Sequence, residues 1–403
     1  MRPAEPPATL GIALSGGGSR AMAFHLGCLR ALDRLGLLPT AALLVTVSGG
    51  SVIGAMYAAR TGPFEAFEAD VRTVLARGFS WPAVVTALTT WEGARALAAF
   101  TALSGAAILR LPLAVLRWLA SLAGYGRLPG EPVNQRPGGS LRRFASRTTI
   151  LRRTFDSLLF RGRTLGQLRK DGPRLVVVAT ELQTGTAFYF SPPGVTNYRL
   201  GRAESGDVPL SQAVAASAAF PLLLPALDET MTFSKGAVLT HERVTLTDGG
   251  VYDNLGLSFL WPDRDPGVSP DVERVRYIIA CRAGYGSRRH AAQLFFASRM
   301  EAVFGTVHSR AQNAAMNRLF DLRSAGKLDG FALSYLDQDD SRLKFPPPGL
   351  VGRAMVADYP TDFPAMPPAW IDALSARGEQ LTYAVIREHV PELLPPGFAF
   401  DPG

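Results

Sequence analysis

The sequence predicts an α/β fold around a mainly parallel sheet. Two short apolar runs, residues 10–14 and 42–47, each end in a glycine turn that a helical pattern follows. This alternation is typical of parallel strands, which are joined by helices. With 403 residues, of which 47% are hydrophobic and 19% charged, the chain can also bury a sizeable core.

The same alternation orders the rest of the chain. The first turn leads into a predicted helix at 21–35, and the second into one at 52–60. Further apolar runs predict strands at 174–180, 186–190, 244–247 and 277–281, an edge strand at 331–335, and helices at 211–219, 293–320 and 369–388. We therefore expect an α/β domain over residues 1–343, with a proline-rich C-terminal extension over 344–403.

An insertion at about 79–150 interrupts this domain. Its first part, 79–126, is apolar and carries Trp81, Trp91 and Trp118. The longest uncharged stretch has 14 residues, whereas a membrane-spanning helix needs about 20. Two interpretations remain open: helices buried in the core, or a lid or interfacial helix that dips into a membrane surface.

The positive charge of the chain is concentrated next to this apolar part. The net charge is +8, yet residues 127–170 hold eleven Lys or Arg and two acids, a net of +9. The segment is either a solvated connector or a surface for an anionic partner. Because aromatic residues do not interleave with the basic ones, we expect an anionic membrane surface over 79–170 rather than nucleic acid.

Composition excludes other classes of site. The only cysteines are Cys28 and Cys281, which excludes a disulfide framework and a zinc site of several cysteines. No metal-binding set is visible in the spacing, and we expect no cofactor. Five histidines limit histidine-based mechanisms. The N-terminus lacks a signal-peptide pattern, so we expect a cytoplasmic protein that is peripheral at the membrane.

The first glycine turn has two functional interpretations. Gly16, Gly17 and Gly18 fit the dinucleotide fingerprint G-x-G-x-x-G/A after a strand. A nucleotide site also needs an acid near the end of the second strand, and none is present there. The same glycines can instead present backbone N–H groups to a developing oxyanion, with help from the following helix.

The second turn carries a candidate nucleophile, Ser48. The sequence T-V-S-G-G, between a strand and a helix, nearly matches the nucleophile elbow G-x-S-x-G. Small residues are needed because the turn is sharp and strained. Thr46 stands where the pattern has glycine, which crowds the elbow.

The candidate base for this serine is Asp248. None of the histidines after Ser48 lies in a recognisable loop motif, whereas Asp248 ends a predicted strand and precedes two glycines. A carboxylate within hydrogen-bond reach can accept the serine proton directly. Asp253 is the rival base, although its D-N-L-G context fits a structural turn better.

Together, these motifs resemble the patatin-like phospholipase family, lipid acyl hydrolases with a Ser–Asp dyad. The matching blocks are S-G-G-G-S-R, V-S-G-G-S and D-G-G, with support from V-A-T-E-L-Q-T-G at 178–185 and A-A-S-A-A-F-P at 215–221. The resemblance implies a three-layer α/β/α sandwich. It also implies Ser48 as nucleophile, Asp248 as base and Gly16, Gly17 and Gly18 as oxyanion hole, with Arg20 steadying the glycine loop or a phosphate group.

The function that this resemblance implies is hydrolysis of ester lipids. The activity would be of the phospholipase A or lysophospholipase type and would pass through a serine acyl-enzyme, without cofactor or metal. Two alternatives remain: a non-catalytic lipid-binding protein on the same fold, and a dinucleotide-binding enzyme that uses the first glycine turn. The presence of both Ser48 and Asp248 argues against the first alternative.

Overall fold

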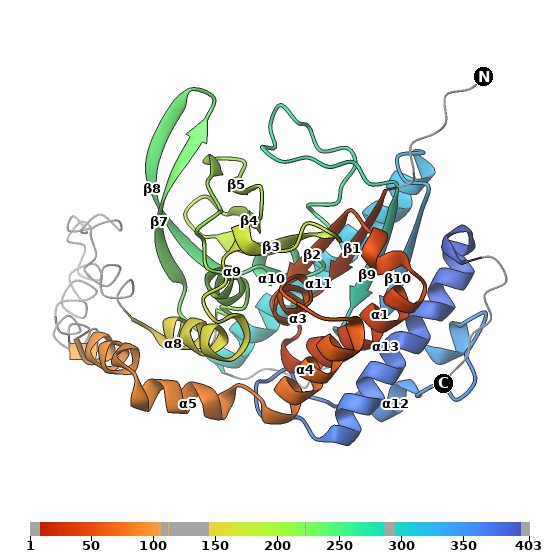
Figure 1. Cartoon of the computed structure of the whole chain (residues 1–403), viewed down its shortest axis with the longest axis horizontal. Helices are drawn as coiled ribbons and strands as arrows, with labels where there is room; N and C mark the ends of the chain where they lie inside the picture. The colour runs from red at the N-terminus through yellow and green to blue at the C-terminus, as the bar shows by residue number, and fades with distance from the viewer. Residues whose placement is uncertain are drawn as a thin grey trace.

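The computed structural model describes residues 9–102, 104, 105, 112, 145–221, 223–285 and 295–395. Within them, a ten-stranded sheet in the order β10-β9-β1-β2-β3-β4-β5-β6-β7-β8 crosses the molecule (Figure 1). The strands are β1 Leu10–Leu14, β2 Leu43–Val47, β3 Arg174–Glu181, β4 Thr186–Ser191, β5 Gly194–Asn197, β6 Gly201–Ala203, β7 Leu227–Lys235, β8 Val238–Asp248, β9 Tyr277–Arg282 and β10 Gly330–Tyr335.

The sheet has a parallel half and an antiparallel half. Strands β10, β9, β1, β2 and β3 run parallel, and from β3 onward the chain folds back and forth through β4 to β8. Strand β8 then returns to pair with β3, with Asp248 opposite Ala179. This return brings the end of β8 to the edge of the sheet where β1 and β2 also end.

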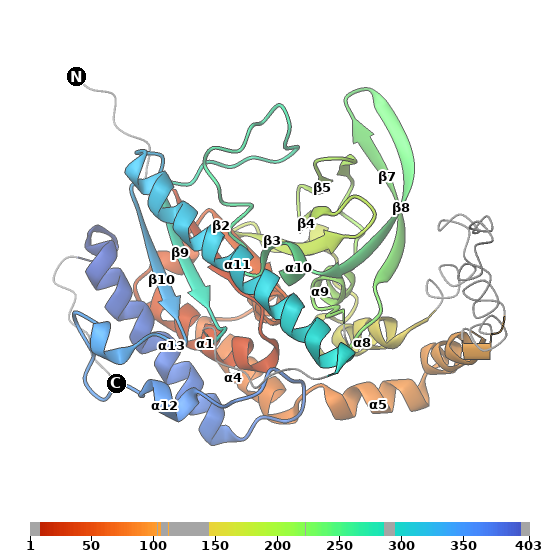
Figure 2. The ribbon, with the colours of Figure 1, turned by 180° about the vertical axis from the view of Figure 1, so that it is seen from behind.

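Helices cover both faces of the sheet and complete three layers. Helices α1, α3, α4 and α13 lie on one face and α11 on the other, as Figures 1 and 2 show from opposite sides. In β1, Ile12 and Leu14 belong to the core under α1, whereas Ala13 belongs to the core on the opposite face. The predicted α/β/α sandwich is therefore confirmed. The helices are α1 Gly18–Arg34, α2 Leu37–Thr40, α3 Gly49–Ala58, α4 Phe64–Arg77, α5 Ser80–Thr89, α8 Arg147–Phe155, α9 Leu210–Ser217, α10 Gly250–Asp253, α11 Phe296–Ser324, α12 Arg353–Val356 and α13 Pro368–His389.

In the antiparallel half, the strands differ most from those that the sequence predicted. Strand β7 was not expected, and β8 begins six residues before the predicted strand at 244. The β7–β8 hairpin is exposed along much of its length and alternates polar with apolar residues only in part. A strand that is stabilised by its neighbour rather than by a buried face leaves a weak hydrophobic signal.

The described part of the apolar insertion is helical and exposed. On α5 and just after it, Trp81, Leu88 and Trp91 are 71%, 79% and 73% exposed. These values do not fit the interpretation of buried helices for this part of the segment. Residues 113–144, which include much of the basic run, lie outside the described residues. No helix among the described residues is both long and apolar enough to cross a bilayer.

Helix α13, in the predicted C-terminal extension, packs closely on α1. The contact uses Gly27 and Gly378: a Cβ atom on Gly27 would lie 1.7 Å from the Ser375 carbonyl oxygen, and one on Gly378 would lie 2.1 Å from that of Phe24. The two backbones can approach this closely only where a side chain is missing. The domain boundary at 344 stays a prediction.

We predict that Gly27→Ala and Gly378→Ala each destabilise the protein. The added methyl group meets backbone, which cannot move aside as a side chain can, so the cost should reach or exceed about 1–3 kcal/mol. The measurement is the free energy of unfolding in urea. As a control, Gly305→Ala in α11 meets nothing within 4 Å and should be neutral or slightly stabilising. Equal stability of all three variants would contradict the close contact.

Candidate active site

Ser48 lies at a strained turn between β2 and α3. Its backbone has φ 51° and ψ −118°, and among the described residues only Arg161 is another non-glycine residue with positive φ. Such a conformation costs about 1–3 kcal/mol and persists only where the surroundings impose it. Here the surroundings impose it by close packing. Gly49 lies so near the first glycine turn that a Cβ on it would be 2.2 Å from the Gly18 carbonyl oxygen. The sharp strand-to-helix turn that the sequence predicted is therefore present, and the role of Ser48 as a nucleophile stays a prediction.

Thr46, the departure from the elbow pattern, is accommodated by a second glycine. Its hydroxyl donates to the Val176 carbonyl at 3.2 Å, and its methyl group points at Gly54 of α3. A Cβ on Gly54 would lie 2.4 Å from that methyl carbon. The Thr46 side chain, which the sequence suggested would crowd the elbow, therefore fits because Gly54 of α3 has no side chain.

Ser217, at the end of α9, holds the elbow in place. Its hydroxyl accepts a hydrogen bond from the Ser48 N–H at 2.9 Å and donates to the Val178 carbonyl at 2.6 Å. The Ser51 hydroxyl contacts the same oxygen at 2.8 Å. Ser217 lies in the block A-A-S-A-A-F-P, whose local pattern gives this serine no site role. Only the packing of α9 against β3 and α3 reveals its position beside Ser48.

The same end of α9 also fixes Asp248. The Asp248 N–H donates to the Ala219 carbonyl at 3.0 Å, and the Gly249 N–H donates to the Ser217 carbonyl at 3.2 Å. The Thr180 hydroxyl donates to the Asp248 carbonyl at 2.8 Å. One short segment therefore sets the positions of the candidate nucleophile and the candidate base together.

The Asp248 carboxyl group is buried and faces Ser48. Burial raises its pKa from 3.8 to about 6, although hydrogen bonds from the Gly250 N–H and the Ser48 hydroxyl favour the charged form. The Gly250 N–H lies 2.7 Å from the Asp248 Oδ1. At neutral pH the group is a carboxylate with an unusually high proton affinity, as a general base requires.

Asp253, the rival base, has a structural task. Its carboxylate accepts hydrogen bonds from the backbone N–H groups of Leu255, Gly256 and Ser258 at 3.1, 3.1 and 2.6 Å. The group ties its own turn together, as the D-N-L-G context predicted.

The first glycine turn packs directly against the elbow. A Cβ on Gly16 would lie 3.2 Å from the Cβ of Ser48. The Gly16 N–H already donates to the Asn254 carbonyl at 3.1 Å. Within the described part of the chain, the N–H groups of Gly17 and Gly18 make no hydrogen bond, and Gly18 begins α1. Of the three predicted oxyanion-hole residues, Gly17 and Gly18 thus have donors available.

Arg20 supports this turn from inside the protein. Its guanidinium group donates to the carbonyls of Ala283 and Tyr359 at 3.0 and 3.2 Å and lies 4.3 Å from the ring centre of Tyr285. The side chain is 7% exposed. These contacts match a positioning role for Arg20 and leave little of it facing a phosphate group.

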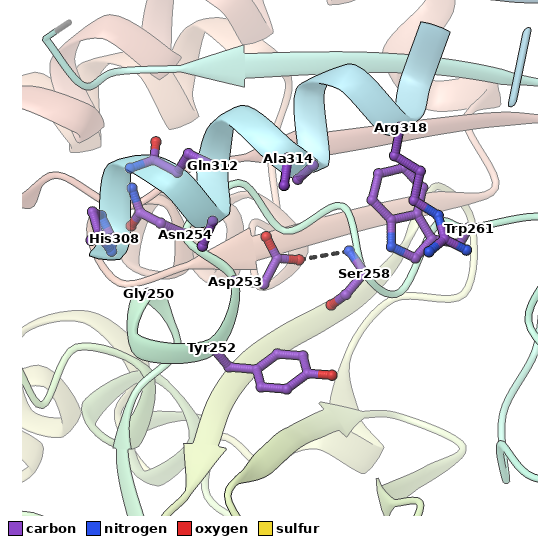
Figure 3. Close-up of a pocket in the computed structure, with 12 residues that line it drawn as sticks. Gly250, Tyr252, Asp253, Asn254, Ser258, Trp261, His308, Gln312, Ala314 and Arg318 are labelled. Atoms are coloured by element: carbon purple, nitrogen blue, oxygen red, sulfur yellow. Dashed lines mark hydrogen bonds between the residues drawn. The ribbon is translucent and has the colours of Figure 1, made fainter. Parts of the chain in front are cut away.

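A cavity of about 340 Å³ lies beside the turn that follows Asp248. Figure 3 shows His308, Gln312 and Arg318 along α11 on one wall, and Tyr252, Asp253 and Asn254 on the other. Burial holds the pKa of His308 below its usual range, although its ring hydrogen-bonds the Gly250 backbone. His308 is therefore a neutral neighbour of the Asp248 turn.

We predict a pH-dependent stability difference between the wild type and Asp248→Asn. Because folding raises the pKa of Asp248 from 3.8 to about 6, the folded state binds an extra proton between these values. Wild-type stability therefore falls as the pH rises through this window and stays lower above it. Relative to that of the wild type, the free energy of unfolding of the variant should therefore rise by up to about 3 kcal/mol between pH 4 and pH 7. Urea unfolding of both proteins across this range measures it; a constant difference would refute the shift.

Comparison with known proteins agrees with this geometry. A family model described as patatin-like phospholipase matches residues 12–261, which include the glycine turn, the elbow and Asp248. A search of curated proteins found no match.

Solved structures with a similar arrangement share little sequence. Human GIVD cytosolic phospholipase A2 in complex with methyl gamma-linolenyl fluorophosphonate is 15% identical, with a TM-score of 0.47, over 94% of this chain and 57% of that one. VipD from Legionella pneumophila is 14% identical, with a TM-score of 0.37, over 94% and 67%. The chain spans little more than half of the human enzyme. The family assignment rests instead on the match to the family model over 12–261: this chain belongs to the patatin-like phospholipase family.

Proposed function

We propose that this protein is a serine hydrolase of ester lipids, with Ser48 as nucleophile and Asp248 as base. The observation that carries the proposal is the pairing of a strained, elbow-mounted serine with a buried carboxylate whose pKa is raised to about 6. Strain at the elbow keeps the hydroxyl exposed to a substrate, and burial gives the carboxylate the proton affinity to activate it.

The reaction proceeds in two halves. The Ser48 oxygen attacks the acyl carbonyl as its proton passes to Asp248. The carbonyl oxygen becomes an oxyanion, and the alcohol leaves with the proton from Asp248, so that an acyl-serine remains. Water then loses a proton to Asp248 and attacks the acyl-serine, which releases the fatty acid and restores both side chains.

The oxyanion is stabilised by the first glycine turn. The N–H groups of Gly17 and Gly18, which have no partner among the described residues, lie at the start of α1, where the positive end of the helix adds to their effect. One such donor is worth about 3–4 kcal/mol in other hydrolases. Arg20 holds the turn through the Ala283 carbonyl and so acts through the glycines rather than on substrate.

Exposed apolar side chains on two helices suit a substrate that arrives from a lipid layer. They are Trp81, Leu88 and Trp91 on and after α5, and Val303 and Val307 near the start of α11. Both views place α5 and the start of α11 on the side toward which the arrowheads of β9 and β10 point (Figures 1 and 2). We propose that these side chains contact the membrane, with the basic segment 127–170 attracting anionic head groups.

Substitution of either residue tests the proposed dyad. Ser48→Ala and Asp248→Asn should each remove nearly all hydrolysis of a lipid ester, a loss of about a thousandfold or more, while the protein stays folded. Because the two residues act as a unit, the double variant should be little worse than either single one. Steady-state kinetics and circular dichroism measure this.

A fluorophosphonate label separates the catalytic proposal from its non-catalytic alternative. The label should attach to Ser48 in the wild type and be absent from Ser48→Ala, as peptide mapping would show. Full activity in Asp248→Asn, or labelling at another serine, would overturn the assignment.

Substitution of the histidines tests whether one of them, and not Asp248, is the base. With Asp248 as base, replacing His241, His308 or His389 by Gln should leave activity within about tenfold, a barrier change near 1.4 kcal/mol. His308 is the critical case, because it lies beside the Gly250 backbone. A thousandfold loss in a folded His308→Gln protein would favour a histidine base.

Substitution of the exposed tryptophans tests the proposed membrane contact. Trp81→Ala with Trp91→Ala should weaken binding to anionic vesicles at least tenfold, because exposed indole rings bury in the interface. Hydrolysis of a small soluble ester should be unchanged. Leu239→Ser, at the exposed tip of the β7–β8 hairpin, is the matched control and should bind like the wild type. Vesicle co-sedimentation decides, and equal binding of all proteins would contradict the proposed contact.

A further inference from the structure

Beneath the first glycine turn lies a fully buried cluster of His25, Cys28 and Cys281. A ring nitrogen of His25 and the two thiol sulfurs all lie within 4.8 Å of one another. All three side chains are at most 1% exposed. His25 and Cys28 stand three residues apart on one face of α1, and Cys281 lies near the end of β9.

One ring nitrogen of His25 has its lone pair unused. The Nε2 atom lies 2.9 Å from the Ser15 carbonyl oxygen, to which it can only donate. In the neutral ring the Nδ1 atom is then an acceptor; among the described residues it makes no hydrogen bond of normal geometry, although the Cys28 thiol interacts with the ring. A buried polar atom without a partner is costly and calls for an explanation. A histidine that donates to a backbone carbonyl through one nitrogen is also the usual arrangement of a metal ligand.

The spacing suits a thiophilic cation. In a tetrahedral zinc site the ligand atoms lie roughly 3.3–3.8 Å apart, given zinc–sulfur and zinc–nitrogen bonds of about 2.3 and 2.0 Å. The three atoms here, which lie within 4.8 Å of one another, need to close in by no more than about 1.5 Å. A fourth donor is at hand, because the Ser334 hydroxyl lies 3.8 Å from the Cys28 sulfur, and Ser334 pairs in register with Cys281.

Charge favours zinc over a monovalent metal. Two thiolates carry two negative charges, and the imidazole and hydroxyl are neutral. A divalent cation makes the buried set neutral, whereas copper(I) would leave one uncompensated negative charge in the core, which is expensive. Soft thiolate ligands select zinc over magnesium or calcium.

Two members of the cluster, His25 and Cys281, contact Ser15, the residue that precedes the three glycines of the first turn. The Ser15 N–H donates to the Cys281 carbonyl at 3.0 Å, and the Ser15 carbonyl contacts the His25 ring at 2.9 Å. A metal that joined α1 to β9 would therefore fix the peptide from which Gly16, Gly17 and Gly18 extend.

We propose that His25, Cys28 and Cys281 form a structural zinc site that anchors the glycine turn. The sequence spacing gave no sign of it, because Cys281 lies more than 250 residues from Cys28 and reaches it only through the pairing of β9 with β1. The test does not depend on hydrolysis, so it can fail or succeed whether or not the protein is a lipase.

The experiment measures bound metal in the full chain. The protein is produced without a polyhistidine tag in zinc-supplemented medium, kept reduced and dialysed against a weak chelator. Mass spectrometry of the metals should find about one zinc ion per chain. Cys28→Ala and Cys281→Ala should each lose at least about nine-tenths of it. His241→Ala, which changes a histidine of the β7–β8 hairpin outside the cluster, should keep it.

A second measurement covers variants that fail to fold. A thiol-specific mercurial added to the wild type should release the zinc to a colorimetric chelator as two thiols are consumed. Refolding with Co²⁺ should give the visible absorption of tetrahedral thiolate-bound cobalt. Wild-type protein without zinc, zinc retained in both cysteine variants, or a Cys28–Cys281 disulfide in its place would overturn the proposal.

Discussion

The strained backbone of Ser48 is the constraint on which the candidate active site depends. A non-glycine residue at φ 51° is unfavourable by itself, so its neighbours must make every other conformation worse. They do so by close packing: Gly49 lies against Gly18, Gly54 makes room for Thr46, and Ser217 receives the Ser48 N–H. The elbow, the first glycine turn and the end of α9 therefore form one closely packed unit, in which a change at any point would displace Ser48.

Burial of Asp248 is a second feature of the site that destabilises the folded state. Desolvation raises the pKa of its carboxyl group to about 6, so the charged form, which is the form the proposed base needs, weakens the folded state at neutral pH. The surrounding structure offsets this cost with the Gly250 N–H and with the strand pairing of β8 to β3. Stability and proposed activity thus make opposite demands on a single side chain, which is common at catalytic sites.

The parts of the site come from distant segments because the sheet changes direction. The parallel strands β1 and β2 end at one edge and deliver the glycine turn and Ser48 there. Asp248 reaches the same edge only because β8 folds back, antiparallel, onto β3. The proposed zinc ligands follow the same logic, since β9 pairs with β1 and carries Cys281 beneath α1. The sheet order is what turns separate motifs into neighbours.

The sequence by itself determined the features that depend on local spacing. The apolar runs and glycine turns predicted β1, α1, β2 and α3, and the order of the three motifs indicated the family that the family model then confirmed. The tertiary structure alone decided which groups meet. In the tertiary structure, the Gly16 N–H donates to the Asn254 carbonyl, and Asp253 binds the backbone of its own turn. The same packing places Ser217 beside Ser48, and Cys281 beside Cys28. The physical reason is that backbone geometry over a few residues follows from local sterics, whereas a contact across hundreds of residues follows from strand register and packing, which no short segment encodes.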